Sequence, residues 1–287
     1  MGKGDQKAPF GIIGSNTFSL KLAMHLASKG HIVRIVDDTI ERVQAGLQTI
    51  AGWTETNRVE GFLDHNQEGQ LLQNIEIGCA VERLAGVQMV VFGNPIHPGR
   101  NPRHEEQFRL LEAVVPPETP ILARLADLRS TGRLLDWVPN RSRVVPFATI
   151  LDDTLPATWE LWDAGDGRNE ALVTCERILH LSGFRSIRFQ GGKTSPLRIL
   201  FLRTLSNCCD MLTRGEEDVD AIDFAFPVAI INQGPFLTAD LIGLERVLEL
   251  NDEAGEVMTR GALQLVASYL RTDRTGFSSG EGFYLYS

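Results

Sequence analysis

The chain has 287 residues, of which 43% are hydrophobic and 23% charged, a composition typical of a soluble protein long enough for two domains. Its 28 basic and 37 acidic residues give a net charge of −9, which argues against nucleic acid or an anionic membrane as the main partner. The sequence contains no apolar run of about 18 residues and no signal-peptide core. We therefore expect a cytoplasmic protein whose partner is a small molecule.

The four cysteines do not indicate a metal site. They are Cys79, Cys175, Cys208 and Cys209, with no C-x-x-C spacing and no histidine close enough in sequence to suggest zinc. We expect free, buried thiols and no bound metal.

Residues 9–38 have the outline of a dinucleotide-binding unit. Residues 10–13 form a short apolar run typical of a strand, residues 20–27 carry apolar side chains near helical spacing, and residues 31–36 are a second strand-like run. This order predicts a strand, a loop, a helix and a second strand.

The glycine fingerprint inside this unit is incomplete. In the intact pattern G-x-G-x-x-G, the first glycine makes the turn, the second lets the backbone approach a pyrophosphate, and the third lets helix and strand touch. Gly14 fills the first place, but Asn16 fills the second and Ser19 the third. The alternative is therefore an ordinary turn in an α/β unit that binds phosphate weakly or not at all.

Two features still favour a nucleotide. The amino end of the helix behind the loop offers N–H groups and a partial positive charge to a phosphate. Asp37 ends the second strand, 23 residues after Gly14, where such units place the acid that accepts ribose hydroxyls. An acid there favours NAD over NADP.

The rest of the chain divides into two parts. Alternating strands and helices up to residue 190 predict a parallel sheet covered on both faces, and Gly191-Gly192 is the predicted boundary. The fold class is thus α/β, with a Rossmann-type domain over residues 1–190 and an all-helical domain over residues 191–287. The further strands are expected at 89–92, 120–123, 142–147, 159–162 and 187–189, and the helices at 40–50, 105–114, 125–135, 171–181, 197–212, 219–226, 237–250 and 261–270.

Two segments in the second part point to one family. The segment from Gly234 to Leu244 has the pattern GPF-x-x-AD-x-x-GL and resembles the C-terminal domain of the 3-hydroxyacyl-CoA dehydrogenase family. The tail from Thr275 to Tyr286 is similar to the closing element of that family. The resemblance implies a Rossmann-type domain that binds NAD, a helical domain that forms a homodimer, and an acyl-CoA in the cleft between them.

The resemblance also assigns the nucleotide residues. It sets Gly14 to Ser19 on the phosphate loop, Asp37 on the ribose acid, and residues 90–95 on the strand and loop that pass the nicotinamide. The candidate cofactor-binding residues are Gly14, Ser15, Asn16, Thr17, Phe18, Asp37 and Asn94.

The family's catalytic residues are largely replaced. The family uses a histidine as base, a glutamate that orients it, and a serine and an asparagine that hold the substrate oxygen. Counting back from Glu160, the histidine position falls on Ala148. Arg124 stands at the serine and Arg198 near the asparagine, so Glu160 alone survives. The candidate catalytic residues are Glu160, Arg124 and Arg198.

Other polar residues leave alternatives open. Arg124 and Arg198 would clamp a carboxylate or phosphate if both face the cleft; the alternative is two surface arginines with local ion pairs. His97 and His104 flank a loop at a strand end, where α/β folds bind ligands.

Two functions are consistent with this sequence. One is an NAD-linked oxidoreductase of the 3-hydroxyacyl-CoA dehydrogenase type with a divergent site. The other is a non-catalytic relative that keeps the scaffold for binding or assembly.

Overall fold

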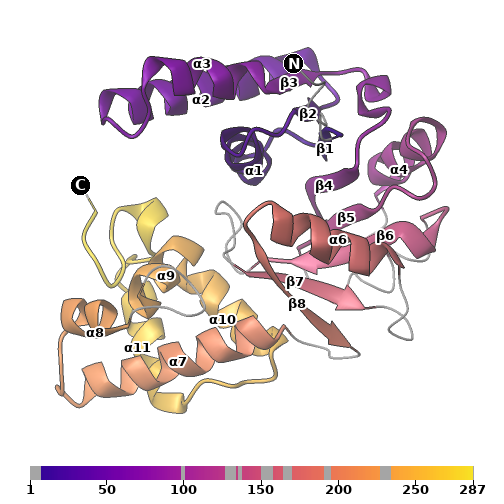
Figure 1. Ribbon diagram of the computed structural model, residues 1–287. Helices are drawn as coiled ribbons and strands as arrows, with labels where there is room; N and C mark the ends of the chain where they lie inside the picture. The colour runs from indigo at the N-terminus through magenta and orange to yellow at the C-terminus, as the bar shows by residue number, and fades with distance from the viewer. Residues whose placement is uncertain are drawn as a thin grey trace. The chain divides into compact units, whose positions relative to one another are not determined.

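The computed structural model describes residues 8–97, 101–126, 134, 138–149, 158–163, 170–190, 195–226 and 234–286 (Figure 1). The chain forms two compact units, each described here by itself. The first contains residues 1–149, 153–155 and 161–191, and the second contains residues 150–152, 156–160 and 192–287. The predicted boundary at Gly191-Gly192 lies outside the described residues.

An eight-stranded sheet organises the first unit. Its strands lie in the order β3-β2-β1-β4-β5-β6-β7-β8, and neighbouring strands from β3 to β6 are parallel. This order confirms the predicted α/β class. The strands are β1 (Phe10–Ile13), β2 (Val33–Val36), β3 (Ile75–Gly78), β4 (Met89–Ile96), β5 (Ile121–Leu125), β6 (Val144–Ala148), β7 (Thr158–Asp163) and β8 (Arg185–Gln190).

Helices cover both faces of this sheet, as predicted for parallel strands. Val90 and Phe92 of β4 join the hydrophobic cluster that contains Phe108 of α4. On the other face, the ring of Phe18 in α1 lies 5.9 Å from that of Phe147 in β6. The helices are α1 (Thr17–Ser28), α2 (Ile40–Val59), α3 (His65–Gln73), α4 (Pro102–Val114) and α6 (Glu170–Leu181), with short 3-10 turns η1 (Val81–Leu84) and η2 (Arg141–Arg143).

Several elements differ from the sequence-based expectation or lie outside the described residues. Strand β3 was not predicted, because its four residues are all half-buried at a sheet edge and show no alternation. Helix α2 continues nine residues past Ile50, where its apolar spacing stops. Most of the helix predicted over 125–135 lies outside the described residues, and Leu125 itself ends β5.

Strand β4 runs further than its sequence suggests. Gly93-Asn94-Pro95 has low strand propensity, and the strand was expected to stop there. It instead continues to Ile96, with a shift of register against β5 between Phe92 and Ile96. Gly93 and Asn94 are thereby held beside the loop that follows β1.

The second unit is helical and has its own hydrophobic core. The predicted helix over 237–250 is two helices, because Gly243 adopts a φ of 90°, a left-handed conformation that interrupts the helix. The helices are α7 (Pro196–Thr213), α8 (Val219–Ala225), α9 (Pro235–Ile242), α10 (Leu244–Glu253) and α11 (Arg260–Leu270), followed by the 3-10 turn η3 (Phe277–Ser279).

Asp240 of α9 connects the two segments that carry the family pattern. Its buried carboxylate accepts hydrogen bonds from Phe283 N and Tyr284 N at 2.9 Å and from Tyr286 Oη at 2.7 Å. A Cβ at Gly282 would collide with this carboxylate. The closing tail therefore packs on α9 through one aspartate and a glycine that leaves room for it.

Asp223 of α8 holds the start of α9 in a similar way. Its carboxylate accepts hydrogen bonds from Phe236 N at 2.9 Å and Leu237 N at 2.8 Å, in the first turn of that helix. A Cβ at Gly234 would overlap the Asp223 side chain. The glycine of the GPF triplet is thus required by packing.

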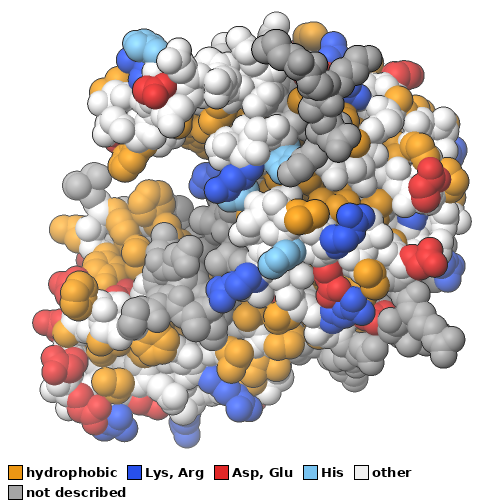
Figure 2. Space-filling model, in the orientation of Figure 1, with side chains coloured by type: hydrophobic (Ala, Val, Ile, Leu, Met, Phe, Trp, Pro, Cys, Tyr) orange, Lys and Arg blue, Asp and Glu red, His pale blue; other side chains and the backbone are white. Residues whose placement is uncertain are grey.

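No helix within the described residues is long and apolar enough to span a membrane. On the face shown in Figure 2, basic side chains are interspersed with acidic ones, in keeping with the net charge of −9.

Candidate functional site

The loop after β1 begins with a glycine that cannot be replaced without strain. Gly14 has a φ of 94°, and a Cβ at this position would collide with the side chain of Asn94. The first glycine of the fingerprint therefore keeps both its conformation and its space.

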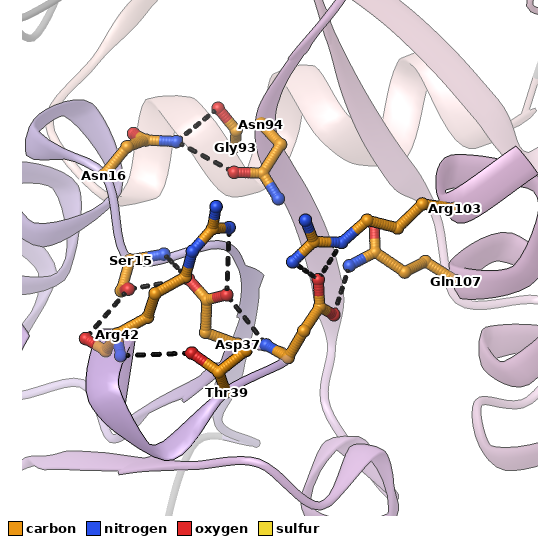
Figure 3. Close-up of polar contacts among 10 residues, drawn as sticks. Ser15, Asn16, Asp37, Thr39, Arg42, Gly93, Asn94, Arg103 and Gln107 are labelled. Carbon is orange, nitrogen blue, oxygen red and sulfur yellow. Dashed lines mark hydrogen bonds and ion pairs between the residues drawn. The ribbon is translucent and has the colours of Figure 1, made fainter. Parts of the chain in front are cut away.

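Asn16, at the second glycine position, joins this loop to β4 (Figure 3). Its Oδ1 accepts a hydrogen bond from Ser19 N at 3.1 Å, which caps helix α1. Its Nδ2 donates to Gly93 O at 3.0 Å and to Asn94 Oδ1 at 3.2 Å. Strand order reverses between β1 and β4, which is where open α/β sheets bind ligands. The Asn16 carboxamide thus bridges the loop after β1 and strand β4 at this point of the sheet.

The third glycine has an unexpected counterpart. Ser19 is completely buried, and a Cβ at Gly93 would collide with its Oγ. Helix α1 can therefore approach the sheet closely, because the residue without a Cβ is Gly93 on strand β4 and not the residue at position 19 of the helix. Sequence reasoning assigned no role to Gly93.

Asp37 is held by the phosphate loop. Its Oδ2 accepts hydrogen bonds from Ser15 N at 2.7 Å and Ser15 Oγ at 2.6 Å, and its Oδ1 accepts one from Asp38 N at 2.7 Å. The guanidinium of Arg42 lies 3.6 Å from Oδ1. The carboxylate stands at the end of β2, but it is only 3% exposed.

A second polar connection runs from the residues after β2 to α4, and only the two adjacent acids Asp37 and Asp38 point to it in the sequence. Asp38 forms an ion pair with Arg103 and accepts a hydrogen bond from Gln107 Nε2 at 2.7 Å. Since β1 lies between β2 and β4 in the sheet, this connection passes beside the carboxyl end of β1.

Thr17 and Phe18 occupy the first turn of α1. Their N–H groups lie where an α-helix makes no internal hydrogen bonds, the position used for phosphate binding. The side chain of Phe18 is fully buried against the sheet. Thr17 and Phe18 would therefore contribute backbone groups to a cofactor.

Arg124 lies beside this loop. It is buried in β5, its Nη1 lies 3.4 Å from Gly93 O, and its guanidinium carbon lies 4.5 Å from the centre of the Phe18 ring. The cation–π contact partly compensates the loss of water.

Glu160 and Arg198 come together at the start of α7. Ser195 Oγ donates to Glu160 Oε2, and Leu197 N donates to Oε1 at 2.8 Å. Burial raises the pKa of Glu160 above its ordinary value, against the opposing effect of these hydrogen bonds and of Arg198. Both carboxylate oxygens thus accept hydrogen bonds from this turn of the chain.

Arg198 pairs with Glu253 at 3.3 Å, and it is buried. The expectation of surface arginines is therefore wrong for both Arg124 and Arg198, because both are buried, although Arg198 does have a local ion pair. Arg124 lies in the first unit and Arg198 in the second.

The remaining candidates differ in their exposure. Ala148 is buried at the end of β6. His97 is exposed, whereas His104 is buried in α4 with its ring 5.2 Å from that of Phe92. Burial lowers the pKa of His104, and neighbouring Arg103 lowers it further.

No group of three His, Cys, Asp or Glu side chains in the described part of the chain could hold a metal ion. Cys79 is exposed, in contrast to the expected burial, because it lies beyond β3 at the sheet edge; the other three cysteines are buried.

A nicotinamide dinucleotide fits part of this arrangement. Gly14 has the left-handed conformation of the first fingerprint glycine, the first turn of α1 presents N–H groups, and Asp37 directly follows β2. Asn16 does not fit without movement, because its side chain already bonds to Gly93 and Asn94.

Comparison with known proteins identifies a family for the C-terminal part of the chain. Residues 198–286 match the family model of the 3-hydroxyacyl-CoA dehydrogenase C-terminal domain. By sequence, no curated protein matches the chain significantly.

Several solved structures share the fold. (S)-3-hydroxybutyryl-CoA dehydrogenase PaaH1 from Ralstonia eutropha is 19% identical with a TM-score of 0.70, over 98% of this chain and 99% of that chain. FadB2 from M. tuberculosis is 18% identical with a TM-score of 0.74, over 99% and 100%. The 3-hydroxybutyryl-CoA dehydrogenase of Escherichia coli K12 is 19% identical with a TM-score of 0.73, over 98% and 60%. These findings confirm the predicted resemblance: residues 198–286 form the C-terminal domain of the 3-hydroxyacyl-CoA dehydrogenase family, and the whole chain has the fold of these dehydrogenases.

Proposed function

We propose that this protein binds NAD through β1, α1 and β2 and acts as an oxidoreductase on a 3-hydroxyacyl-CoA or a related hydroxy acid. The observation that carries the proposal is the position of the Asp37 carboxylate, at the end of β2 and bonded to the loop that Gly14 begins. We further propose that it works in the cytoplasm as a homodimer formed through its helical domain.

Each nucleotide residue has a separate task in this proposal. Gly14 and the N–H groups of Thr17 and Phe18 receive the pyrophosphate, since a helix amino end favours anions. Asp37 Oδ1 accepts a hydrogen bond from the adenosine ribose, while Ser15 holds Oδ2 in place. Asn94, near the end of β4, would lie beside the nicotinamide half of the cofactor. Bound NAD would supply the hydride acceptor.

On the substrate side, Arg198 would keep Glu160 in place, since the two come together at the start of α7 in the second unit. Glu160 is the group proposed to take the hydroxyl proton, because Ala148 cannot. A carboxylate with a raised pKa is a better general base near neutral pH than an exposed one.

A second candidate function is a non-catalytic relative that uses the scaffold for binding or assembly. Two observations favour it. Asn16 fills the phosphate crevice, and both oxygens of Glu160 are occupied by the start of α7. A carboxylate engaged in this way acts as a helix cap, which is a structural role.

Titration of the full chain with NADH, followed by cofactor fluorescence, tests the first proposal. Asp37→Ala should weaken binding at least about tenfold, the worth of one charge-assisted hydrogen bond. Asp64→Ala, which removes the cap of α3 in the same unit, is the control and should leave the affinity unchanged. Absence of NADH binding by the unmodified protein would sink the dehydrogenase proposal.

Turnover separates the two functions. Oxidation of 3-hydroxybutyryl-CoA with NAD that disappears in Asp37→Ala and in Glu160→Gln would end the non-catalytic alternative. NADH binding without turnover of any 3-hydroxyacyl-CoA would favour that alternative instead.

A further inference from the structure

Near Asp37, at the ribose end of the candidate cofactor site, the negative charge is buried and the positive charges are exposed. Asp37 is 3% exposed, whereas the side chains of Arg42 and Arg103 are 51% and 47% exposed. In Figure 3 the Arg42 guanidinium lies between Asp37 and the Asn16–Asn94 pair, and the Arg103 guanidinium lies to one side of it, directed at the carboxylate of Asp38. The groups that a ligand would meet first are therefore cations.

Asp37, the acid that would repel a phosphate, is buried and already accepts hydrogen bonds from neighbouring residues. Asp37 Oδ2 accepts two hydrogen bonds from Ser15, and Oδ1 accepts one from Asp38 N and faces Arg42. Its negative charge is compensated by donors on three sides. An acid in this state repels a neighbouring phosphate less than an open carboxylate does.

The two guanidinium groups remain open to a ligand. Arg103 pairs with Asp38, which is 30% exposed, and such an exposed ion pair contributes little to stability because water already solvates both charges. Arg42 lies 3.6 Å from the buried Asp37, and its half-exposed guanidinium has further N–H groups for a phosphate without leaving that carboxylate. A phosphate accepts bidentate hydrogen bonds from guanidinium groups, and these are among the stronger polar contacts in proteins. The first turn of α2, which contains Arg42, adds a partial positive charge.

We propose that Arg42 and Arg103 form a subsite for the 2′-phosphate of an adenosine nucleotide, so that the protein accepts NADP(H) as well as NAD(H). The inference rests on the proposed function, since it extends the same cofactor site, and it differs from the expectation that the acid at Asp37 favours NAD over NADP. Asp38 keeps its hydrogen bond to Gln107 when Arg103 turns toward the phosphate.

Paired titrations of the full chain with NADH and NADPH test this subsite. The two dissociation constants should agree within about threefold, and Arg42→Ala and Arg103→Ala should each weaken NADPH binding by about tenfold, the worth of one charge-assisted hydrogen bond, with NADH changed less than about twofold. Arg58→Ala is the matched control, because Arg58 lies in the same helix as Arg42 and pairs with Glu68 at 3.1 Å. It should change neither affinity.

Two results would overturn the subsite: NADPH binding at least about thirtyfold weaker than NADH binding, or equal losses for both cofactors in both arginine variants. If neither dinucleotide binds, the proposed function fails, and 2′,5′-ADP then tests the arginines alone. Binding of 2′,5′-ADP that Arg42→Ala abolishes supports the phosphate subsite, whereas no binding of 2′,5′-ADP refutes it.

Discussion

The loop after β1 and the C-terminal tail on α9 both depend on glycines, but they have kept their family patterns to different degrees. In the tail, Gly282 and Gly234 leave space for the carboxylates of Asp240 and Asp223, within one hydrophobic unit. In the loop, Gly14 alone fills its expected position. The tail glycines are required by internal packing, whereas the second fingerprint position holds Asn16, whose side chain bonds to Gly93 and Asn94.

The largest expected effect lies in the tail. Asp240→Ala removes three hydrogen bonds and leaves buried donors unpaired, so the free energy of unfolding should fall by about 3–5 kcal/mol. Urea unfolding followed by tryptophan fluorescence measures this loss. Asp218→Ala removes only the exposed cap of α8 and should cost about 1 kcal/mol. Equal losses in the two variants would contradict the anchoring role of Asp240.

Substitution of Gly93 tests whether this glycine on β4 provides the space that a glycine at position 19 of α1 would otherwise provide. Gly93→Ala should lower the free energy of unfolding by about 1–3 kcal/mol, because the new methyl group meets Ser19 Oγ. Adding Ser19→Gly should recover part of that loss. Gly52→Ala, at an open position in α2, should stabilise by about 0.5–1 kcal/mol. If the double variant Gly93→Ala/Ser19→Gly is no more stable than Gly93→Ala alone, contact with Ser19 is not the cause of the loss of stability.

Asn16→Gly separates ligand binding from helix capping in the loop. NADH affinity should rise about threefold to tenfold, because the crevice loses its carboxamide bridge, while stability falls by a few tenths of a kcal/mol. Fluorescence titration and urea unfolding measure the two quantities. Asn16→Ala, which keeps a Cβ, should tighten binding less. If NADH affinity is unchanged in Asn16→Gly, the Asn16 side chain does not obstruct the pyrophosphate.

His104 gives the smallest effect, on pH dependence. Its pKa in the folded protein is lowered from 6.5, so as pH falls through 6.5 the unfolded chain takes up the proton first. The free energy of unfolding should then decrease as the pH falls from about 7.5 to about 5.5 on account of this group. His104→Gln should flatten that decrease in urea titrations, and an unaltered slope would exclude a buried neutral imidazole.

The sequence by itself determined the class of fold, most of the helices and strands, the turn at Gly14, the acid at Asp37 and the family of the C-terminal domain. These features are encoded locally, in apolar spacing and in short motifs. Even Asn16 was identified as a departure from the fingerprint. The sequence would also have allowed us to predict that Asn16 caps α1, since a helix cap depends only on residues close in sequence.

Only the tertiary structure decided what the departures do. Asn16 bonds to Gly93, 77 residues away, and Arg103 pairs with Asp38, 65 residues away. Strand order brings these residues together, because β1 lies between β2 and β4. No spacing in the sequence records that adjacency, so the relocated glycine, the bridged crevice and the two exposed arginines became visible only when the sheet was assembled.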